Sequence, residues 1–400
     1  MYVMNFTIIL FIQLIVLCGS AVVPGCEIDP FVSNAPLLIR SGTSKILYPS
    51  YNKTTVRFNV GDTVEFSCPQ TTLLVDGART ESIVEATCIS NQLFRLTGKK
   101  FLWNQISCDK TPVSTSRFVT GSCGSNTRLA EIGFQLDSTR FLHTMTVCFN
   151  TKTQSSLWCQ TEISSNIASR VSGTPRPYFF QDEGFYNFTV NNFYTRSRQR
   201  KTINNLLGLP NNSLKYIDNG SLYYLARGHL SARADFVYAA QQNATFKYIN
   251  TAPHWQSFNG RNWNIAEADT RSYASSRNVS LQVWTGTYGI ATLPHENTRQ
   301  QVDLYLYVNN GDKAMPVPAM FWKLVYNPAD RRGVVLIGLN NPHQSDVSKN
   351  IICDDVSSKM TWLNWNGKNI DQGYSYACNV ASFRKVVAYA PSLPVSGLLI

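Results

Sequence analysis

The chain has 400 residues, of which 44% are hydrophobic and 12% aromatic. This composition excludes a disordered or fibrous protein and provides enough apolar surface for two domains with a sizeable core. The formal net charge of +11 indicates either a polyanionic partner, such as nucleic acid, a heparin-like glycan or an anionic membrane, or simply a basic surface that keeps the protein soluble.

The first 21 residues have the pattern of a secretory signal peptide. Residues 8–18 form an apolar run much shorter than a membrane span, and the small residues Gly19 and Ala21 allow cleavage after Ala21. No later segment approaches about 20 consecutive apolar residues, so we expect no membrane insertion. We therefore expect a secreted, extracellular protein. Six N-glycosylation sequons follow, at Asn52, Asn187, Asn211, Asn219, Asn243 and Asn278.

Cysteine usage divides the rest of the chain unevenly. Seven of the nine cysteines after the signal peptide lie between Cys26 and Cys159. This predicts a cysteine-rich β N-terminal region over residues 22–160 and a larger domain over residues 161–400, held mainly by its core. No CxxC pair is present, which argues against a zinc knuckle. Cys353 and Cys378 are expected to pair.

The first four cysteines, with Trp103 before the last of them, resemble a sushi-type β module. The resemblance implies the bridges Cys26–Cys88 and Cys68–Cys108. Three cysteines then remain. Cys123 lies in a flexible loop that can reach Cys148 in a strand-like run. Cys159 is then left over, and we expect it to be a buried free thiol; the alternative is an exposed cysteine that links two chains.

Residues 194–201, YTRSRQRK, are the densest basic run. Three readings stay open: a processing site, an exposed phosphate-binding loop, or an ordinary solvated stretch.

The segment LYYLARGHLSARADF, residues 222–236, is expected to form a short strand that carries chemistry. Arg227 and His229 are two residues apart, so their side chains share one face of a strand. Gly228 between them allows a close approach to the backbone. Motifs of serine hydrolases, zinc proteases and nucleotide-binding folds are absent from the chain.

Residues 260–276 are predicted to form a helix that starts at Asn259 and presents Glu267 and Arg271 on one face. From residue 301 onward an antiparallel meander is predicted, with a turn at residues 309–313. If the strand packs against the helix, the resulting site holds a base, an amide oxygen, a carboxylate and arginines. That set suits phosphodiester hydrolysis with Mg²⁺ as the cofactor, or with Mn²⁺ in its place.

The two stretches ARGHLSARADF and FNGRNWNIAEADTR resemble the DNA/RNA non-specific endonuclease family. These are His-Me finger nucleases with a ββα-metal core. The resemblance implies an α+β fold with an antiparallel sheet, preceded here by the disulfide-rich β region. Insect gut nucleases that degrade double-stranded RNA also carry such a long N-terminal region. The resemblance to them implies an enzyme of the gut lumen or another extracellular space. It also implies that the substrates are RNA, including double-stranded RNA, and DNA.

The family's roles are carried over residue by residue. His229 is the expected general base, Asn259 the direct metal ligand, and Glu267 the residue that orders water at the metal. Arg227 and Arg271 are expected to contact the phosphate, and Asn250 to support the site. Substrate-binding roles are assigned to Arg233 and Arg198, the latter chosen from the three arginines at positions 196, 198 and 200 because the family uses an arginine some thirty residues before the histidine.

One position departs from the family pattern. Ala226 stands where the family has aspartate. The sequence therefore leaves two alternatives to an active endonuclease: a catalytically impaired homologue that still binds nucleic acid, and a secreted protein that binds glycans or surfaces through its N-terminal region.

Overall fold

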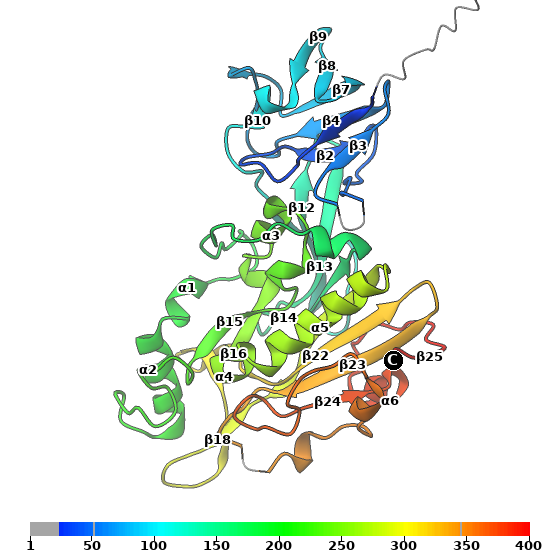
Figure 1. Ribbon diagram of the computed structural model, residues 1–400. Helices are drawn as coiled ribbons and strands as arrows, with labels where there is room; N and C mark the ends of the chain where they lie inside the picture. The colour runs from blue at the N-terminus through cyan, green and yellow to red at the C-terminus, as the bar shows by residue number, and fades with distance from the viewer. Residues whose placement is uncertain (1–23, 51–52, 345) are drawn as a thin grey trace, which may run out of the picture.

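The computed structural model describes residues 24–50, 53–344 and 346–400. The expected signal peptide, residues 1–21, and the sequon at Asn52 lie outside these ranges. The protein consists of a small N-terminal module of short strands and a larger body of sheet and helices (Figure 1). Its sheets are mostly antiparallel, and the predicted α+β class is confirmed.

The N-terminal module contains a five-stranded sheet in the order β2-β4-β7-β8-β9, flanked by the pair β1-β3 and the group β10-β5-β6. Phe66, Phe94 and Trp103 fill its core together with two disulfides. The strands are β1 (Cys26–Ile28), β2 (Leu37–Arg40), β3 (Val56–Phe58), β4 (Thr63–Ser67), β5 (Leu73–Val75), β6 (Ala78–Arg79), β7 (Ile83–Ser90), β8 (Leu93–Leu96), β9 (Lys99–Leu102) and β10 (Ile106–Cys108).

One large sheet forms the centre of the body. Its order is β11-β12-β13-β14-β17-β22-β23-β24, and β25 pairs in parallel with β23. The strands are β11 (Thr115–Val119), β12 (Thr127–Gln135), β13 (Phe141–Asn150), β14 (Ser155–Ile163), β17 (Leu281–Ile290), β22 (Pro318–Asn327), β23 (Arg332–Leu339), β24 (Ser375–Cys378) and β25 (Gly397–Leu398). The boundary expected at residue 160 falls within β14, which pairs with strands on both sides. We therefore place the end of the N-terminal module between Cys108 and Thr115.

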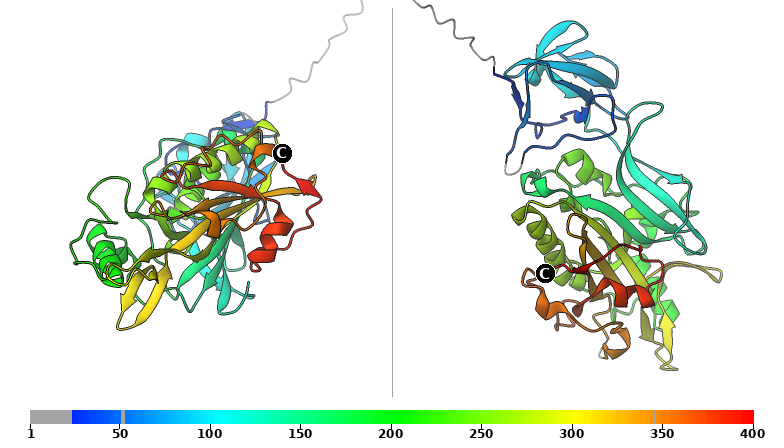
Figure 2. Two further views of the ribbon diagram at one scale, coloured as in Figure 1. Left: turned by 90° about the horizontal axis from the view of Figure 1, so that it is seen from below. Right: turned by 90° about the vertical axis from the view of Figure 1, so that its right-hand side faces the viewer.

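The elements that carry the predicted site lie against one face of this sheet (Figures 1 and 2). They are β15 (Leu225–His229), α3 (Ala239–Ala244), β16 (Thr251–Trp255), α4 (Gln256–Asn259) and α5 (Asn262–Ser276). The opposite face packs against α6 (Val380–Val386) through Phe383. Further elements are α1 (Val190–Phe193), α2 (Arg196–Leu207), β18 (Thr292–Pro294), β19 (Gln301–Asp303), β20 (Tyr305–Asn309) and β21 (Asp312–Pro316).

Several sequence-based expectations can be compared with these elements. The predicted turn is confirmed, between β20 and β21, but the single meander is wrong: β20 and β21 form a separate two-stranded sheet, whereas β22 and β23 pair within the large sheet. The basic run at residues 194–201 lies mostly within α2, so it is not a loop. The predicted helix start at Asn259 is wrong. This residue ends α4, and Gly260 and Arg261 separate it from α5, because the backbone of Arg261 is not helical (φ −125°, ψ −105°).

All four predicted disulfides are present: Cys26–Cys88, Cys68–Cys108, Cys123–Cys148 and Cys353–Cys378. Cys159 is a buried free thiol in the centre of the sheet, as expected, and the Ser231 hydroxyl donates a hydrogen bond to its sulfur at 3.1 Å. No helix in the described ranges has the length and apolar character needed to cross a membrane.

The N-terminal module packs against the body through aromatic residues around Tyr238. The rings of Phe31 and Tyr48 lie 5.8 and 5.5 Å from that of Tyr238. The Tyr238 hydroxyl donates to the Leu47 carbonyl at 2.5 Å, and Gln241 Nε2 donates to the Tyr48 hydroxyl at 2.9 Å. Tyr238 directly precedes α3 and Gln241 lies within it, so the module contacts the helix that also carries the pocket residue Gln242.

Candidate active site

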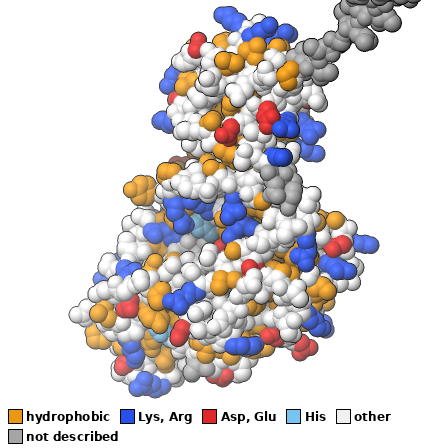
Figure 3. Space-filling model, viewed as in Figure 1, with side chains coloured by type: hydrophobic (Ala, Val, Ile, Leu, Met, Phe, Trp, Pro, Cys, Tyr) orange, Lys and Arg blue, Asp and Glu red, His pale blue; other side chains and the backbone are white. Residues whose placement is uncertain are grey.

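A single pocket of about 440 Å³ brings most of the predicted residues together. Figure 3 shows lysine and arginine side chains gathered on this side of the body, around a hollow where a histidine is visible. The predicted residues in its lining are His229, Arg233, Asn259, Glu267 and Arg271. Residues from β15, α4 and α5, which are up to 42 positions apart in the chain, therefore share one cavity.

Gly228 and His254 explain how β15 is held. The strand pairs antiparallel with β16, and Ala226 lies opposite His254. A side chain at Gly228 would place its Cβ 2.4 Å from His254 Cβ, so only glycine fits there. His254 is fully buried and stacks on Phe321 at 3.9 Å. It belongs to the core behind the strand and does not line the pocket.

Asn250 fixes the chain immediately after His229. Its side-chain oxygen accepts from the Ser231 amide at 2.9 Å, and its Nδ2 donates to the Ser231 and Thr245 carbonyls at 2.9 and 3.0 Å. The residue is completely buried. These three bonds hold the turn that directs His229 toward the pocket.

The His229 ring lies between two aromatic rings. The centroids of Phe179 and Phe246 are 5.2 and 5.0 Å from it, and its Nε2 has no hydrogen-bond partner among the described residues. Burial, reinforced by the positive charges of Arg176 and Arg233, lowers the pKa of His229 to about 3. The imidazole is therefore neutral at physiological pH, and a neutral imidazole has one unprotonated nitrogen that can accept a proton.

Glu267 lies on α5, partly exposed in the same pocket. Burial raises the pKa of its carboxyl group to about 7, although the charges of Lys323 and Arg271 oppose this rise. Arg271 donates to Asp235 at 2.8 Å, and this ion pair is almost completely buried. Lys323 on β22 is fully buried and donates to Thr285 Oγ1 at 2.7 Å. A positive charge thus lies beneath the acidic side of the pocket.

Asn259 presents an oxygen that is free to bind a ligand. Its Nδ2 donates to Gln256 Oε1 at 3.1 Å, and its Oδ1 has no hydrogen-bond partner in the part of the chain that the structure describes. The same ranges contain no group of three histidine, cysteine or acidic side chains that could hold a metal. An amide oxygen and a carboxylate in one pocket nevertheless suit Mg²⁺, which prefers oxygen ligands and keeps several waters. The residues present therefore fit such an ion.

Two predicted arginines are not in this pocket. Arg227 donates to the Tyr248 hydroxyl at 3.2 Å and to Asn191 Oδ1 at 2.6 Å. It does share a face with His229, since the Phe179 ring contacts both side chains. Arg198 lies on α2, above the Phe193 ring, and lines a separate hollow with Lys201.

Sequence reasoning missed Arg170 and Arg176, which line the pocket beside His229. Both belong to the segment RVSGTPRP, residues 170–177, which runs past β15 and is tied to the site by a bond from Arg233 to the Thr174 carbonyl at 2.7 Å. Two arginines in a short segment rich in proline and glycine were the available signal. They lie more than fifty residues before His229, which is farther than the spacing that guided the choice of Arg198.

A scan against family models identified the DNA/RNA non-specific endonuclease family over residues 125–383, which is more than half of the chain. The chain belongs to this family. As a family member, the protein is a nuclease that acts on nucleic acids. The match also begins well before residue 160, in agreement with the continuous sheet.

Among curated relatives, a salivary endonuclease of Lutzomyia longipalpis is 28% identical over 82% of this chain and 74% of its own length. The salivary protein Tsal2A of Glossina morsitans morsitans is 23% identical over 91% of this chain and 90% of its own. One chain of the crystal structure of the EndoG/EndoGI complex aligns with 60% of this chain and 87% of its own, with 18% identity and a TM-score of 0.36.

Proposed function

We propose that the protein is a secreted, metal-dependent endonuclease that hydrolyses phosphodiester bonds in RNA and DNA. One observation carries the proposal: a neutral histidine whose Nε2 has no hydrogen-bond partner among the described residues shares a pocket with an amide oxygen that also lacks one there, a carboxylate and four arginines. The histidine can serve as the base that activates water. The arginines, and a metal held by the amide oxygen and the carboxylate, would neutralise the charge on the phosphate.

In this proposal His229 removes a proton from the attacking water. Its pKa is low while the pocket is empty, partly because Arg176 and Arg233 are close. A bound phosphate offsets these positive charges and makes the imidazole more basic, so the base is strengthened when substrate is in place. Asn250 holds the ring toward the water through the bonds that fix the following turn.

The phosphate is bound by the arginines that line the pocket, Arg170, Arg176, Arg233 and Arg271. Arg271 is oriented by Asp235, so its guanidinium enters the pocket at a fixed angle. A Mg²⁺ ion, or Mn²⁺, held by Asn259 with Glu267 nearby, would supply further neutralisation of the phosphate charge in the transition state. Arg227 acts from the adjacent face, where Asn191 and Tyr248 hold it.

The substrate is recognised through its phosphates, because the pocket offers positive charge and few groups for base edges. RNA, including double-stranded RNA, and DNA are both expected substrates. Extracellular location is supported by the signal-peptide pattern, by four disulfides and by the salivary origin of the relatives. The gut lumen is one such location.

A direct test is the digestion of duplex RNA, duplex DNA and single strands, with Mg²⁺ and with a chelator. Cleavage of all of them that stops with the chelator supports the proposal. Binding without cleavage by the wild-type protein contradicts it and favours the impaired homologue suggested by Ala226. The variant Ala226→Asp tests the impaired homologue directly. A gain of cleavage activity in this variant would show that the alanine limits the rate of the enzyme.

A further inference from the structure

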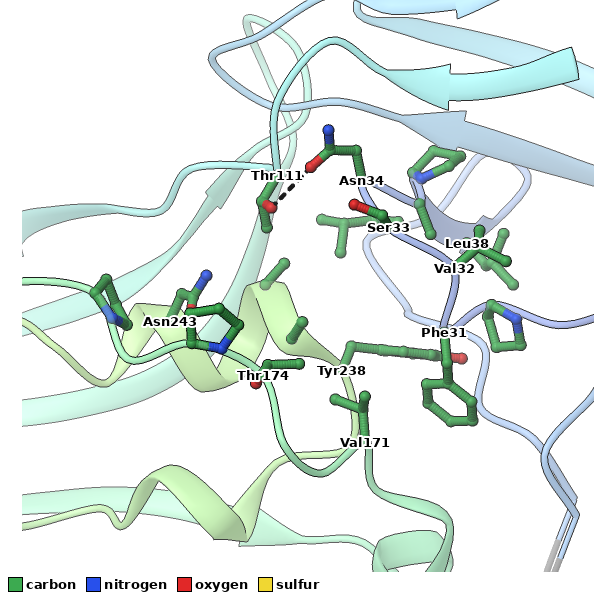
Figure 4. A pocket seen from close by; sticks show the side chains of 18 of the residues that line it. Phe31, Val32, Ser33, Asn34, Leu38, Thr111, Val171, Thr174, Tyr238 and Asn243 are labelled. Carbon is green, nitrogen blue, oxygen red and sulfur yellow. Dashed lines mark hydrogen bonds between the residues drawn. The ribbon is translucent and has the colours of Figure 1, made fainter. Parts of the chain in front are cut away.

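A second pocket, of about 320 Å³, lies between the N-terminal module and the body (Figure 4). One wall is the module segment from Pro30 to Leu38. The other is formed by residues 171–177 and the start of α3. Val171 and Arg176 line both this pocket and the catalytic pocket. The two cavities are therefore neighbours that share a wall, and Arg176 stands between them.

The chemistry of the two cavities differs. The catalytic pocket is dominated by arginines, whereas the second pocket has apolar walls, including Val32 and Pro175, with a few amide and hydroxyl groups. Asn243 Oδ1 is buried there without a hydrogen-bond partner among the described residues. Asn34 uses its Oδ1 to accept from Thr111 at 3.1 Å, which leaves its amide group available as a donor. Apolar walls with amide and hydroxyl groups among them suit a nucleobase.

We propose that this pocket binds a nucleobase of the substrate, next to the phosphate held in the catalytic pocket. The inference rests on the proposed nuclease function and extends it to a base subsite. A nucleotide carries an anion and an aromatic ring a short distance apart, and the arginine-rich cavity and the apolar one share a wall. The N-terminal module, through residues 30–38, supplies half of this subsite.

The consequence concerns which strands the enzyme prefers. A base inside a duplex is paired and stacked, so it enters the pocket only after it is opened out. An unpaired base enters directly. The subsite therefore contributes binding energy to single-stranded or locally opened substrate and little to a closed duplex, while phosphate contacts serve both.

The test uses two exposed valines of the module as a matched pair. Val32 lines the pocket and Val60 does not, and their exposed fractions are 44% and 50%. Val32→Glu places a charge in the apolar wall, and Val60→Glu makes the same change in net charge elsewhere. We expect Val32→Glu to raise KM for a short single-stranded oligonucleotide about fivefold or more, with kcat nearly unchanged, and to leave duplex cleavage unaffected. Val60→Glu should behave as wild type on both substrates.

A second measurement reports the base itself. Oligonucleotides with 2-aminopurine at successive positions are titrated into the His229→Ala protein, where burial of the base changes its fluorescence. One position should respond, and the response should be lost in His229→Ala with Val32→Glu but kept with Val60→Glu. Because Asn243 starts a sequon, both preparations, before and after enzymatic removal of N-glycans, are measured. A response at the same position in either preparation supports the subsite.

The failure of this inference differs from failure of the nuclease proposal. If wild-type protein cleaves but the two valine variants are indistinguishable on single strands, and no 2-aminopurine position responds in either preparation, the subsite is overturned and the nuclease remains. If wild-type protein cleaves none of the substrates, the proposed function itself is overturned.

Discussion

Two histidines on adjacent strands show what distinguishes the candidate active site from the core behind it. Within the part of the chain that the structure describes, both His229 and His254 have ring nitrogens without hydrogen-bond partners, and burial lowers the pKa of each. His254 is surrounded by aromatic rings, stacked on Phe321 and close to Phe258, with no exposed surface. His229 lines a cavity that also contains arginines and oxygen ligands. An unsatisfied nitrogen thus becomes chemically useful only where a substrate can reach it.

The first prediction tests this contrast most strongly. His229→Ala should lower the cleavage rate about 10²-fold or more, because a positioned general base contributes about that much. Binding of nucleic acid and the unfolding transition should remain near wild type, since the side chain is at the pocket surface. Initial rates on duplex RNA measure the loss. Near-normal rates would show that another group is the base.

His254→Ala should have the reverse effect. Removing a ring that stacks on Phe321 leaves a cavity in the core, and we expect the free energy of unfolding to fall by about 3 kcal/mol. Cleavage per folded molecule should stay close to wild type at low temperature. Denaturant unfolding and rates measured on the same sample provide the check. A large rate loss at unchanged stability would instead make His254 the base.

Asn259→Ala removes the amide oxygen that has no hydrogen-bond partner in residues 24–50, 53–344 and 346–400. The Mg²⁺ concentration for half-maximal rate should rise at least about tenfold, while binding of nucleic acid in the presence of chelator should be unchanged. Asn264→Ala is a suitable control, because this amide also lines the pocket but has no assigned metal role. An unchanged Mg²⁺ midpoint for Asn259→Ala would remove the residue from the metal site.

The local parts of the site could be predicted from the sequence, whereas the distant parts could not. Strand alternation places Arg227 and His229 on one face, and helix spacing places Glu267 and Arg271 on one face, so these relations follow from the backbone alone. Asn259 is predicted in the right pocket but on the wrong element, because the Asn259–Gly260 pair, which is a turn signal, is interpreted as the start of the helix. Arg176 reaches the pocket through a crossing segment that no periodicity describes.

The same distinction holds for the fold. The disulfides of the N-terminal module follow from the resemblance of its cysteine spacing to a sushi-type module, and the hairpin β20–β21 follows from alternation and the turn at Asn310 and Gly311. The sheet that joins β14 to β17 is a pairing between strands more than a hundred residues apart, which the sequence does not show. The position of Lys323 could be predicted only in part. A single lysine in the apolar run VPAMFWKLVY indicates a buried charge, but the sequence does not show that this charge lies beneath Glu267.

Lys323 gives the next prediction. Burial raises the pKa of Glu267 to about 7, and the positive charge of Lys323 lowers it. In Lys323→Met the carboxyl group should therefore be protonated up to a higher pH, and the acid limb of the pH–rate profile should move upward by about one unit. Lys323→Arg keeps the charge and should move the limb much less. An acid limb that is identical in wild type and Lys323→Met would show that Glu267 does not control it.

The last prediction compares two arginines that the sequence and the structure rank differently. Arg176 lines the catalytic pocket, whereas Arg198 lies on α2 and lines a separate hollow. Each substitution to alanine removes one positive charge, so long-range attraction of the polyanion falls equally. Only Arg176→Ala also removes a contact to the phosphate, and we expect its KM to rise about fivefold above that of Arg198→Ala at low salt. Raising the salt concentration screens the shared long-range part but preserves the difference between the variants. Equal KM values at every salt concentration would mean that Arg176 acts only through its net charge. A larger effect of Arg198→Ala would support Arg198 as the substrate-binding arginine, as predicted from the sequence, and would place the substrate path over α2.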